Sequence, residues 1–203
     1  MADNNHNQYY SNCWSAFKKG DEKKFEILHH AFFHPLYDYA LHLLQDRDLA
    51  YDVIQELYIK LWAKRESLPE VVFVKAYLVR SLRSSILNKL RSLKLYELKI
   101  SLRQEADIEF SPEDIIIKNE KDFSSANQLI TVLNNLPARQ REIIYLKFYE
   151  GLSNKEISEI MNIQYQSLVN IINRTLDSLK SILKNHPDLL LLFYALEYVY
   201  MQR

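Results

Sequence analysis

The sequence predicts an all-α protein with an N-terminal four-helix bundle, a flexible linker and a C-terminal helical domain that contains a helix-turn-helix. Its 203 residues include only two glycines and five prolines, too few for the tight turns that usually connect strands. Apolar residues instead recur at steps of three and four through residues 9–97 and again through 126–186. Residues 98–125 lose this period and turn acidic, which is typical of a linker.

Caps and prolines divide the N-terminal stretch into helices. Gly20 follows a short first helix, and Asp21 is an N-cap candidate because its carboxylate can accept a hydrogen bond from an orphan amide. Pro35 is expected to interrupt the next helix. Beyond it, Leu57 and Leu61 belong to an apolar stripe with four-residue steps. We expect helices over residues 11–18, 21–34, 36–45, 48–64 and 71–95.

The C-terminal stretch predicts a helix-turn-helix. Ser153 and Glu156 have the spacing of a capping box, in which each side chain satisfies the other's backbone amide. Asn162 can adopt the left-handed conformation that ends a helix. A last helix over 165–183 would then bury Leu168, Ile172, Leu176, Leu179 and Leu183. Helices over 128–135 and 137–149 are expected before this motif.

The second helix of such a motif can enter a major groove, where residues off its buried face meet base edges. Glutamine and asparagine can pair with adenine, valine can touch a thymine methyl, and basic residues suit phosphates. The candidate DNA contacts are Lys155, Tyr165, Gln166, Val169, Asn170, Asn173 and Arg174. A helical hairpin that binds no nucleic acid is the alternative for this segment alone.

The charges are segregated along the chain although their net is zero. Residues 75–103 hold eight Lys/Arg against one acid, a net of +7. Residues 104–124 hold seven acids against two lysines, a net of −5. A basic helix followed by an acidic segment indicates a local surface for nucleic acid, which the net charge conceals.

Several short motifs resemble a known family. In the C-terminal domain, Leu136-Pro137, Arg141-Glu142, Gly151-Leu152-Ser153, Lys155-Glu156-Ile157 and Asn162-Ile163 resemble region four of sigma-70-type factors. In the N-terminal domain, Asp48-Leu49-Ala50, Asp52 to Leu57 and Leu61-Trp62 resemble the polymerase-binding helix of region two. Lys75 to Leu78 with Arg83 and Arg91 resemble its promoter-melting helix. Two such regions joined by a linker resemble the extracytoplasmic-function subfamily, and the Tyr165 start and Leu-rich tail are similar to Bacteroidetes-type members.

This resemblance implies a promoter-recognition subunit that binds core RNA polymerase and promoter DNA and is masked by an anti-sigma factor. It implies that Asp52, Gln55 and Glu56 contact polymerase. The residues implied at the minus-ten element are Lys75, Tyr77, Arg80, Arg83, Asn88, Lys89 and Arg91. Melting requires cations for the backbone and an aromatic group for an unstacked base, and Tyr77 stands where the family often has tryptophan.

The remaining residues indicate no enzyme, metal or cofactor. His30 and His34 share a helix face, but His29 and His42 do not complete a ligand set with carboxylates or cysteines. Cys13 is the only cysteine, and no signal peptide or membrane-length apolar stretch is evident, so we expect a cytoplasmic protein. The apolar tail 187–203 is expected to form a helix that packs on the chain or on a partner.

Two other functions compete with this interpretation. A one-component repressor would combine the helix-turn-helix with a ligand-binding helical bundle, and would need an apolar pocket and a dimer interface. A pure interaction module would use the same helices without DNA. Binding to purified core polymerase separates the three.

Overall fold

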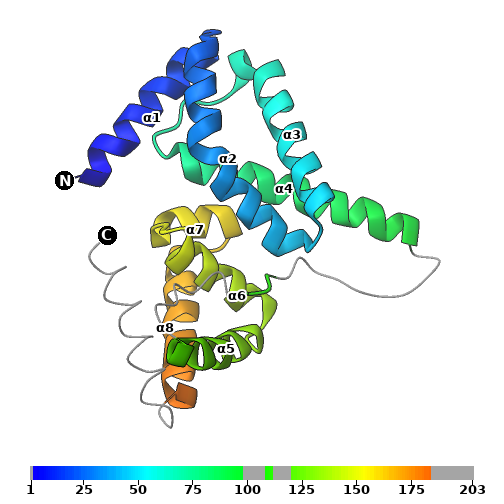
Figure 1. Ribbon diagram of the computed structural model, residues 1–203. Helices are drawn as coiled ribbons and strands as arrows, with labels where there is room; N and C mark the ends of the chain where they lie inside the picture. Colours follow the sequence, from blue (N-terminus) through cyan, green and yellow to red (C-terminus); the bar gives the residue numbers. More distant parts are fainter. Residues whose placement is uncertain (1, 98–107, 112–119, 184–203) are drawn as a thin grey trace. The chain divides into compact units, whose positions relative to one another are not determined.

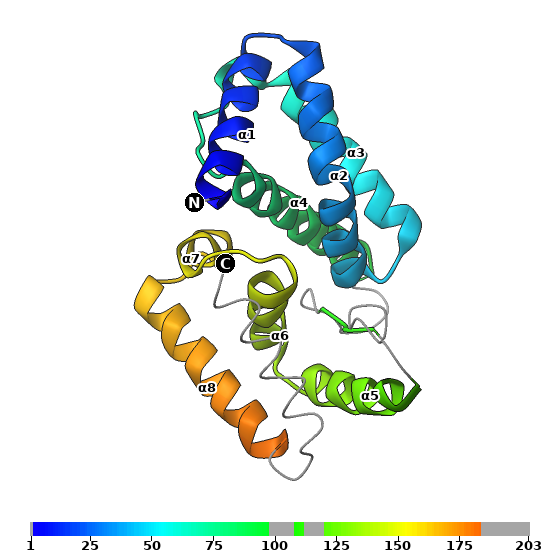
Figure 2. The same ribbon diagram turned by 60° about the vertical axis from the view of Figure 1, so that its left-hand side comes forward.

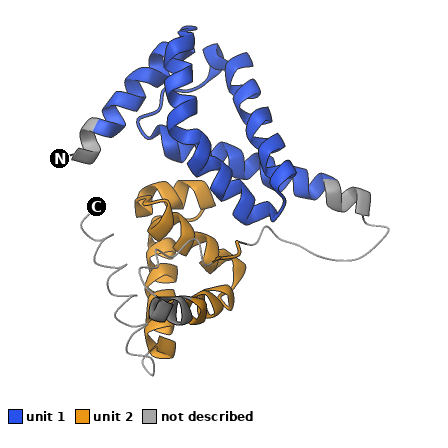
Figure 3. Cartoon of the chain, viewed as in Figure 1, with its two compact units in different colours: residues 1–106 blue, residues 107–203 orange. Residues whose placement is uncertain are grey.

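The computed structural model divides into two compact units, residues 1–106 and 107–203, shown in two colours in Figure 3. The structure describes residues 2–97, 108–111 and 120–183. Every regular element within these residues is helical, so the predicted all-α class is confirmed. The expected tail helix over 187–203 lies outside the described residues.

The first unit consists of four long helices: α1 (Ala2–Lys18), α2 (Glu22–Leu44), α3 (Arg47–Ala63) and α4 (Val74–Glu97). Helix α2 packs against both α1 and α3, and α4 packs across all three (Figures 1 and 2). A 3₁₀ turn, η1 (Arg65–Ser67), follows α3. The predicted four-helix bundle is therefore present, and α1 begins earlier than the expected residue 11.

The core of this unit follows the predicted stripes. Leu57 and Leu61 of α3 are buried, as are Leu78, Leu82 and Ile86 of α4. Burying one leucine or isoleucine stabilises the fold by roughly 1.5–3 kcal/mol. The stripes thus fix which side of each helix faces inward, and they leave the polar sides in solvent.

The predicted interruption at Pro35 is wrong, because α2 runs through it without a break. A proline inside a helix removes one amide donor and costs about 3 kcal/mol or more. Leu28, Phe32, Leu36 and Tyr39 on either side of Pro35 are all buried on one face. Their combined burial outweighs the cost of the proline.

Side-chain caps set the helix ends in this unit. The carboxylate of Asp21 accepts a hydrogen bond from the Lys24 amide at 3.1 Å, so the predicted N-cap is confirmed. Asp46 caps α3 in the same way through the Leu49 amide at 2.9 Å. Gln45 ends α2 in the left-handed region with φ of 53°, which lets the chain reverse into α3 within two residues.

The second unit contains α5 (Glu120–Asn134), α6 (Ala138–Ile144), α7 (Asn154–Met161) and α8 (Tyr165–Leu183). A π-helical turn, η3 (Tyr145–Tyr149), continues α6. Helix α8 packs against α5, α6 and α7 (Figure 1). The predicted helices are present, but α5 starts eight residues before the expected 128, inside the segment predicted to be linker.

Part of the predicted linker belongs to the second unit. Ile108 and Phe110 are buried, and the Phe110 ring lies 6.1 Å from the Tyr145 ring. The Asn134 side chain accepts from the Phe110 amide at 2.8 Å and donates to the Phe110 carbonyl at 3.0 Å. Sequence periodicity missed this contact because a four-residue segment is too short to show a period.

We predict that Asn134→Ala loosens residues 108–111, because both backbone groups of Phe110 lose their partner. The free energy of unfolding of the second unit should fall by about 1–2 kcal/mol. Hydrogen exchange of the Phe110 amide should accelerate in the full chain. Asn135→Ala is the matched control, since the Asn135 side chain is exposed. Equal exchange rates in the two variants would contradict the assignment.

Candidate nucleic-acid and protein interfaces

Helix α4 presents a polar stripe opposite its buried one. Arg80, Asn88 and Arg91 are exposed, and their spacing of eight and three residues places them on one face with the half-buried Tyr77. Ser84 lies between them and is exposed, and its hydroxyl donates to the Arg80 carbonyl at 3.0 Å. Arg91 donates to the Asn88 side chain at 3.3 Å. The stripe carries two cations along about three helical turns.

The other predicted minus-ten residues, Lys75, Arg83 and Lys89, are half-buried and do not lie on this stripe. Lys75 and Lys89 lie near the two ends of the buried row of Leu78, Leu82 and Ile86, and Arg83 lies at its edge. The Lys89 ammonium lies 3.6 Å from the Glu56 carboxylate of α3. Four of the seven predicted residues therefore share one row, and the other three lie away from it.

Tyr77 is held by the first helix. Its ring meets the buried Trp14 ring edge-on, with 5.1 Å between the ring centroids. One turn earlier, Phe73 and Val72 are 40% and 58% exposed. Sequence analysis missed this pair, although two adjacent apolar residues outside the leucine stripe were a usable signal. An exposed aromatic ring is thus available at the start of the polar stripe.

Helix α3 exposes the three residues predicted to bind polymerase, Asp52, Gln55 and Glu56. The Glu56 carboxylate lies 3.0 Å from the Lys60 ammonium and 3.6 Å from that of Lys89. The hydrogen bond and charge of Lys60 lower the pKa of Glu56, and Lys89 adds to the effect. Glu56 is therefore ionised and held in place, and it joins the exposed face of α3 to α4.

Two apolar residues accompany these polar groups. Ile59 is 66% exposed and Tyr51 is 47% exposed, on the same side of α3 as Asp52 and Gln55. The Tyr51 ring lies 6.1 Å from the Phe33 ring of α2. Apolar anchors surrounded by polar groups are typical of protein-binding surfaces. Sequence analysis missed both residues because it treated only the buried stripe as apolar.

The helix-turn-helix forms as predicted. Ser153 caps α7 through the Glu156 amide at 3.3 Å, and the Glu156 carboxylate accepts from the Ser153 amide at 2.8 Å. Asn162 has φ of 51°, and the amide of Ile163 donates to the Ser158 carbonyl at 3.0 Å. Only residues 162–164 separate α7 from α8. These contacts fix the angle at which α8 leaves α7.

The outer face of α8 carries most of the predicted DNA contacts. Gln166, Asn170, Asn173 and Arg174 are all exposed and lie opposite the buried Leu168, Ile172 and Leu179. Gln166 donates to Asn170 at 3.4 Å.

The other predicted contacts lie around this face. Tyr165 is exposed at the helix start, Val169 is half-buried at the edge of the face, and Lys155 is exposed on α7. The buried set differs from the predicted one at one position, because Thr175 is buried and Leu176 is only half-buried.

Comparison with known proteins identifies both units. The family model described as sigma-70 region 2 matches residues 28–95, and the model described as sigma-70, region 4 matches residues 126–178. The chain belongs to the sigma-70 family. Its two matched regions make it a promoter-recognition subunit of RNA polymerase of the extracytoplasmic-function type. This function replaces the two alternatives, a one-component repressor and an interaction module without DNA.

Curated sigma factors of Bacillus subtilis are similar to this chain. The RNA polymerase sigma factor SigZ is 26% identical over 161 residues, which cover 78% of this chain and 86% of SigZ. SigV is 29% identical over 124 residues, which cover 61% of this chain and 69% of SigV. The ECF RNA polymerase sigma factor SigX is 19% identical over 175 residues, which cover 83% of this chain and 86% of SigX.

Two solved structures share the fold. The sigma factor RpoE, in complex with the anti-sigma factor NepR from Bartonella quintana, gives a TM-score of 0.60 at 23% identity, covering 80% of this chain and 98% of that one. CnrH, in complex with the cytosolic domain of CnrY, gives a TM-score of 0.58 at 16% identity, covering 87% and 97%.

Of the histidines of α2, His29 packs against α3, and His30 and His34 are exposed. The His29 ring lies 4.5 Å from the Tyr58 ring, and burial followed by the charge of His30 lowers the pKa of His29. His30 lies 3.7 Å from the Glu26 carboxylate. Among the described residues, no group of three or more His, Cys, Asp or Glu could hold a metal ion. No helix within those residues is long and apolar enough to cross a membrane.

We predict that the Glu56 carboxyl titrates below the usual pKa of glutamate and that Lys60→Met raises this pKa towards the ordinary value. The pKa of Glu56 is lower in the folded than in the unfolded chain. The ion pairs therefore stabilise the fold at any pH above the ordinary glutamate pKa, and this stabilisation is lost as the pH falls through the lowered pKa of Glu56. Carboxyl-carbon NMR of the full chain measures the titration. Lys64→Met, an exposed lysine one turn further along, should leave it unchanged. If Lys60→Met left the pKa of Glu56 unchanged, the pairing of Glu56 with Lys60 would be refuted.

Proposed function

We propose that the exposed face of α3, defined by Tyr51, Asp52, Gln55, Glu56 and Ile59, is the docking face for core RNA polymerase. Its composition supports this role. Two exposed apolar side chains, Tyr51 and Ile59, lie among acidic and amide groups, and the acidic groups favour a partner surface that is basic. The buried stripe on the opposite side of α3 keeps this face rigid. Glu56 is already paired with Lys60, so Asp52 carries the charge that is free of those lysines.

We propose that the polar stripe of α4, made of Tyr77, Arg80, Asn88 and Arg91, faces the minus-ten element. The observation that carries this proposal is that the stripe lies opposite three fully buried residues of the same helix, Leu78, Leu82 and Ile86. Its arginines suit the phosphate backbone, and the exposed Phe73 ring beside Tyr77 suits a base that has left the stack. Lys75, Arg83 and Lys89 lie away from the stripe and would add to the positive potential around α4.

The outer face of α8 is proposed to read the second promoter element. Gln166, Asn170 and Asn173 offer amide groups to base edges, and Arg174 and Lys155 contact phosphates. One acid, Asp177, is exposed one turn beyond Arg174. Because this face carries few cations, it releases few counterions when it binds duplex DNA, and its own affinity for DNA is low. The face therefore contributes specificity, and its tether to the first unit and to polymerase raises its effective concentration at the promoter.

The proposed role needs no catalytic group, metal or cofactor in this chain, because polymerase performs the chemistry. The chain would act in the cytoplasm, where core polymerase works. RpoE and CnrH are each solved with an anti-sigma factor or a cytosolic partner domain. We extend this to the present chain and propose an anti-sigma factor that covers the docking face of α3, since a covered docking face excludes polymerase.

The docking proposal predicts that Asp52→Lys combined with Ile59→Asp lowers the affinity for core polymerase by about tenfold or more, because both an anchor and a charge are lost. Thermal stability should stay nearly unchanged, since both side chains are exposed. Titration of labelled full chain with purified core polymerase measures the affinity. Glu26→Lys, an exposed charge reversal on α2, is the control. Native affinity in the double variant would exclude this face as the docking site.

The α8 proposal predicts different outcomes for amide and charged residues. Asn170→Ala should change which base is preferred at one promoter position, at a cost of about 1–3 kcal/mol for the preferred base. Arg174→Ala should weaken all promoters about equally and reduce the salt slope by roughly 0.9. Asp177→Asn should strengthen all promoters about equally. Promoter selection with the reassembled holoenzyme measures all three, and a uniform loss in Asn170→Ala would show that Asn170 does not read a base.

A further inference from the structure

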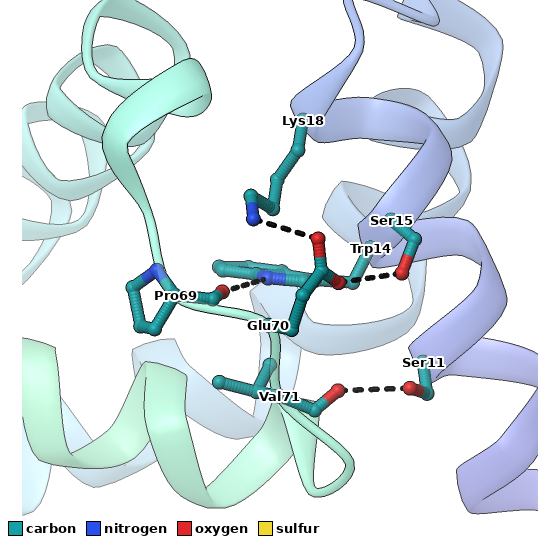
Figure 4. Close-up of polar contacts among 7 residues, drawn as sticks. All are labelled: Ser11, Trp14, Ser15, Lys18, Pro69, Glu70 and Val71. Atoms are coloured by element: carbon teal, nitrogen blue, oxygen red, sulfur yellow. Dashed lines mark hydrogen bonds and ion pairs between the residues drawn. The ribbon is translucent and has the colours of Figure 1, made fainter.

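Three consecutive residues between α3 and α4 are each held by a side chain of α1 (Figure 4). The buried Trp14 donates its indole N–H to the Pro69 carbonyl at 2.9 Å. Ser11 donates its hydroxyl to the Val71 carbonyl at 2.9 Å. Between them, Glu70 is held through its side chain. We call residues 69–71 the pinned segment.

The Glu70 carboxylate receives two donors from α1. Ser15 Oγ donates to one oxygen at 2.6 Å, and Lys18 Nζ lies 2.7 Å from the other. The Lys18 side chain is only 14% exposed, so its ammonium is held close to the protein surface. Glu70 itself is exposed, and its place is set by these two contacts rather than by burial.

The four donors share one face of α1. Ser11, Trp14, Ser15 and Lys18 are spaced by three, one and three residues, which is the spacing of side chains along one side of a helix. The rotation of α1 is fixed because Trp14 and Phe17 are buried. Helix α1 therefore acts as a rigid row of donors along an otherwise irregular segment.

The pinned segment leads directly to the apolar pair at the start of the α4 stripe. Val72 and Phe73 follow it and are exposed, and α4 begins at Val74. The amide of Tyr77 donates to the Phe73 carbonyl at 3.1 Å, and the Tyr77 ring contacts Trp14. Trp14 thus touches both the pinned segment and the first turn of the helix that follows. Movement of residues 69–71 would move Phe73.

We propose that Trp14, Ser15 and Lys18 are positioning residues that preset Phe73 and the first turn of α4 for promoter opening. This inference rests on the proposed role of the α4 stripe. Holding an irregular segment before DNA binds removes the entropy cost of ordering it during binding. The pinned segment therefore favours strand opening through the position it gives to Phe73, and it is not needed for docking to polymerase through α3.

The test uses two substitutions that change the net charge in opposite directions. Lys18→Met removes a positive charge and Glu70→Gln removes a negative one, and each breaks the same contact. A direct effect of charge on DNA would move opening in opposite directions. Loss of positioning should lower opening in both, by about two- to fivefold, the size expected for a partly exposed ion pair. Combining them should add little further loss.

Open complexes are measured with the full chain, core polymerase and a linear duplex promoter recovered from genomic fragments by the wild-type holoenzyme. Permanganate reactivity of unpaired thymines reports the open fraction. On the same promoter with a pre-opened minus-ten segment, the variants should give the same open fraction as the wild type, because this template is already open before the protein binds. Core affinity should equal that of the wild type. Lys23→Met, an exposed lysine on α2, is the charge-matched control.

The outcomes separate this inference from the proposed function. A wild-type chain that opens no promoter with core polymerase refutes both before any variant is made. If the wild type opens promoters, three results would overturn the positioning role alone. The variants could open the duplex normally, they could change opening in opposite directions, or they could lose affinity for core polymerase. If Lys18→Met does not fold, Ser15→Ala removes one of the two Glu70 contacts and should show the same template dependence at smaller size.

Discussion

The burial of Leu78, Leu82 and Ile86 along α4 is the constraint on which the first unit depends. Three fully buried residues at four-residue steps permit only one rotation of the helix about its axis. That rotation sends Arg80 and Asn88 outward and leaves their neighbours on the flanks. The apolar core therefore determines which side chains form the polar stripe, although no core residue belongs to it.

Contacts between helices couple the surfaces of this unit to one another. Glu56 on the exposed face of α3 pairs with Lys89 on α4, so an ion pair joins these two helices. Trp14 on α1 contacts both Pro69 and Tyr77. Each of these contacts joins segments that lie far apart in the sequence.

The second unit relies on local chemistry to a greater degree. Its helix-turn-helix is defined by the reciprocal Ser153–Glu156 cap and by the left-handed Asn162, all within ten residues. The two hydrogen bonds between Asn134 and Phe110 are an exception to this local character, since they join residues 24 positions apart. They bring residues 108–111 into the unit.

The sequence by itself determined the all-α class, the caps at Asp21 and Ser153, and the outward face of α8. These features depend on side chains within about four residues of each other, a range over which periodicity and capping are physically specified. Only the tertiary structure decided that α2 continues through Pro35, that Lys89 turns towards Glu56 and that Trp14 holds Pro69. Those outcomes depend on burial and hydrogen bonds between distant segments, whose free energies exceed local preferences and leave no periodic trace in the chain.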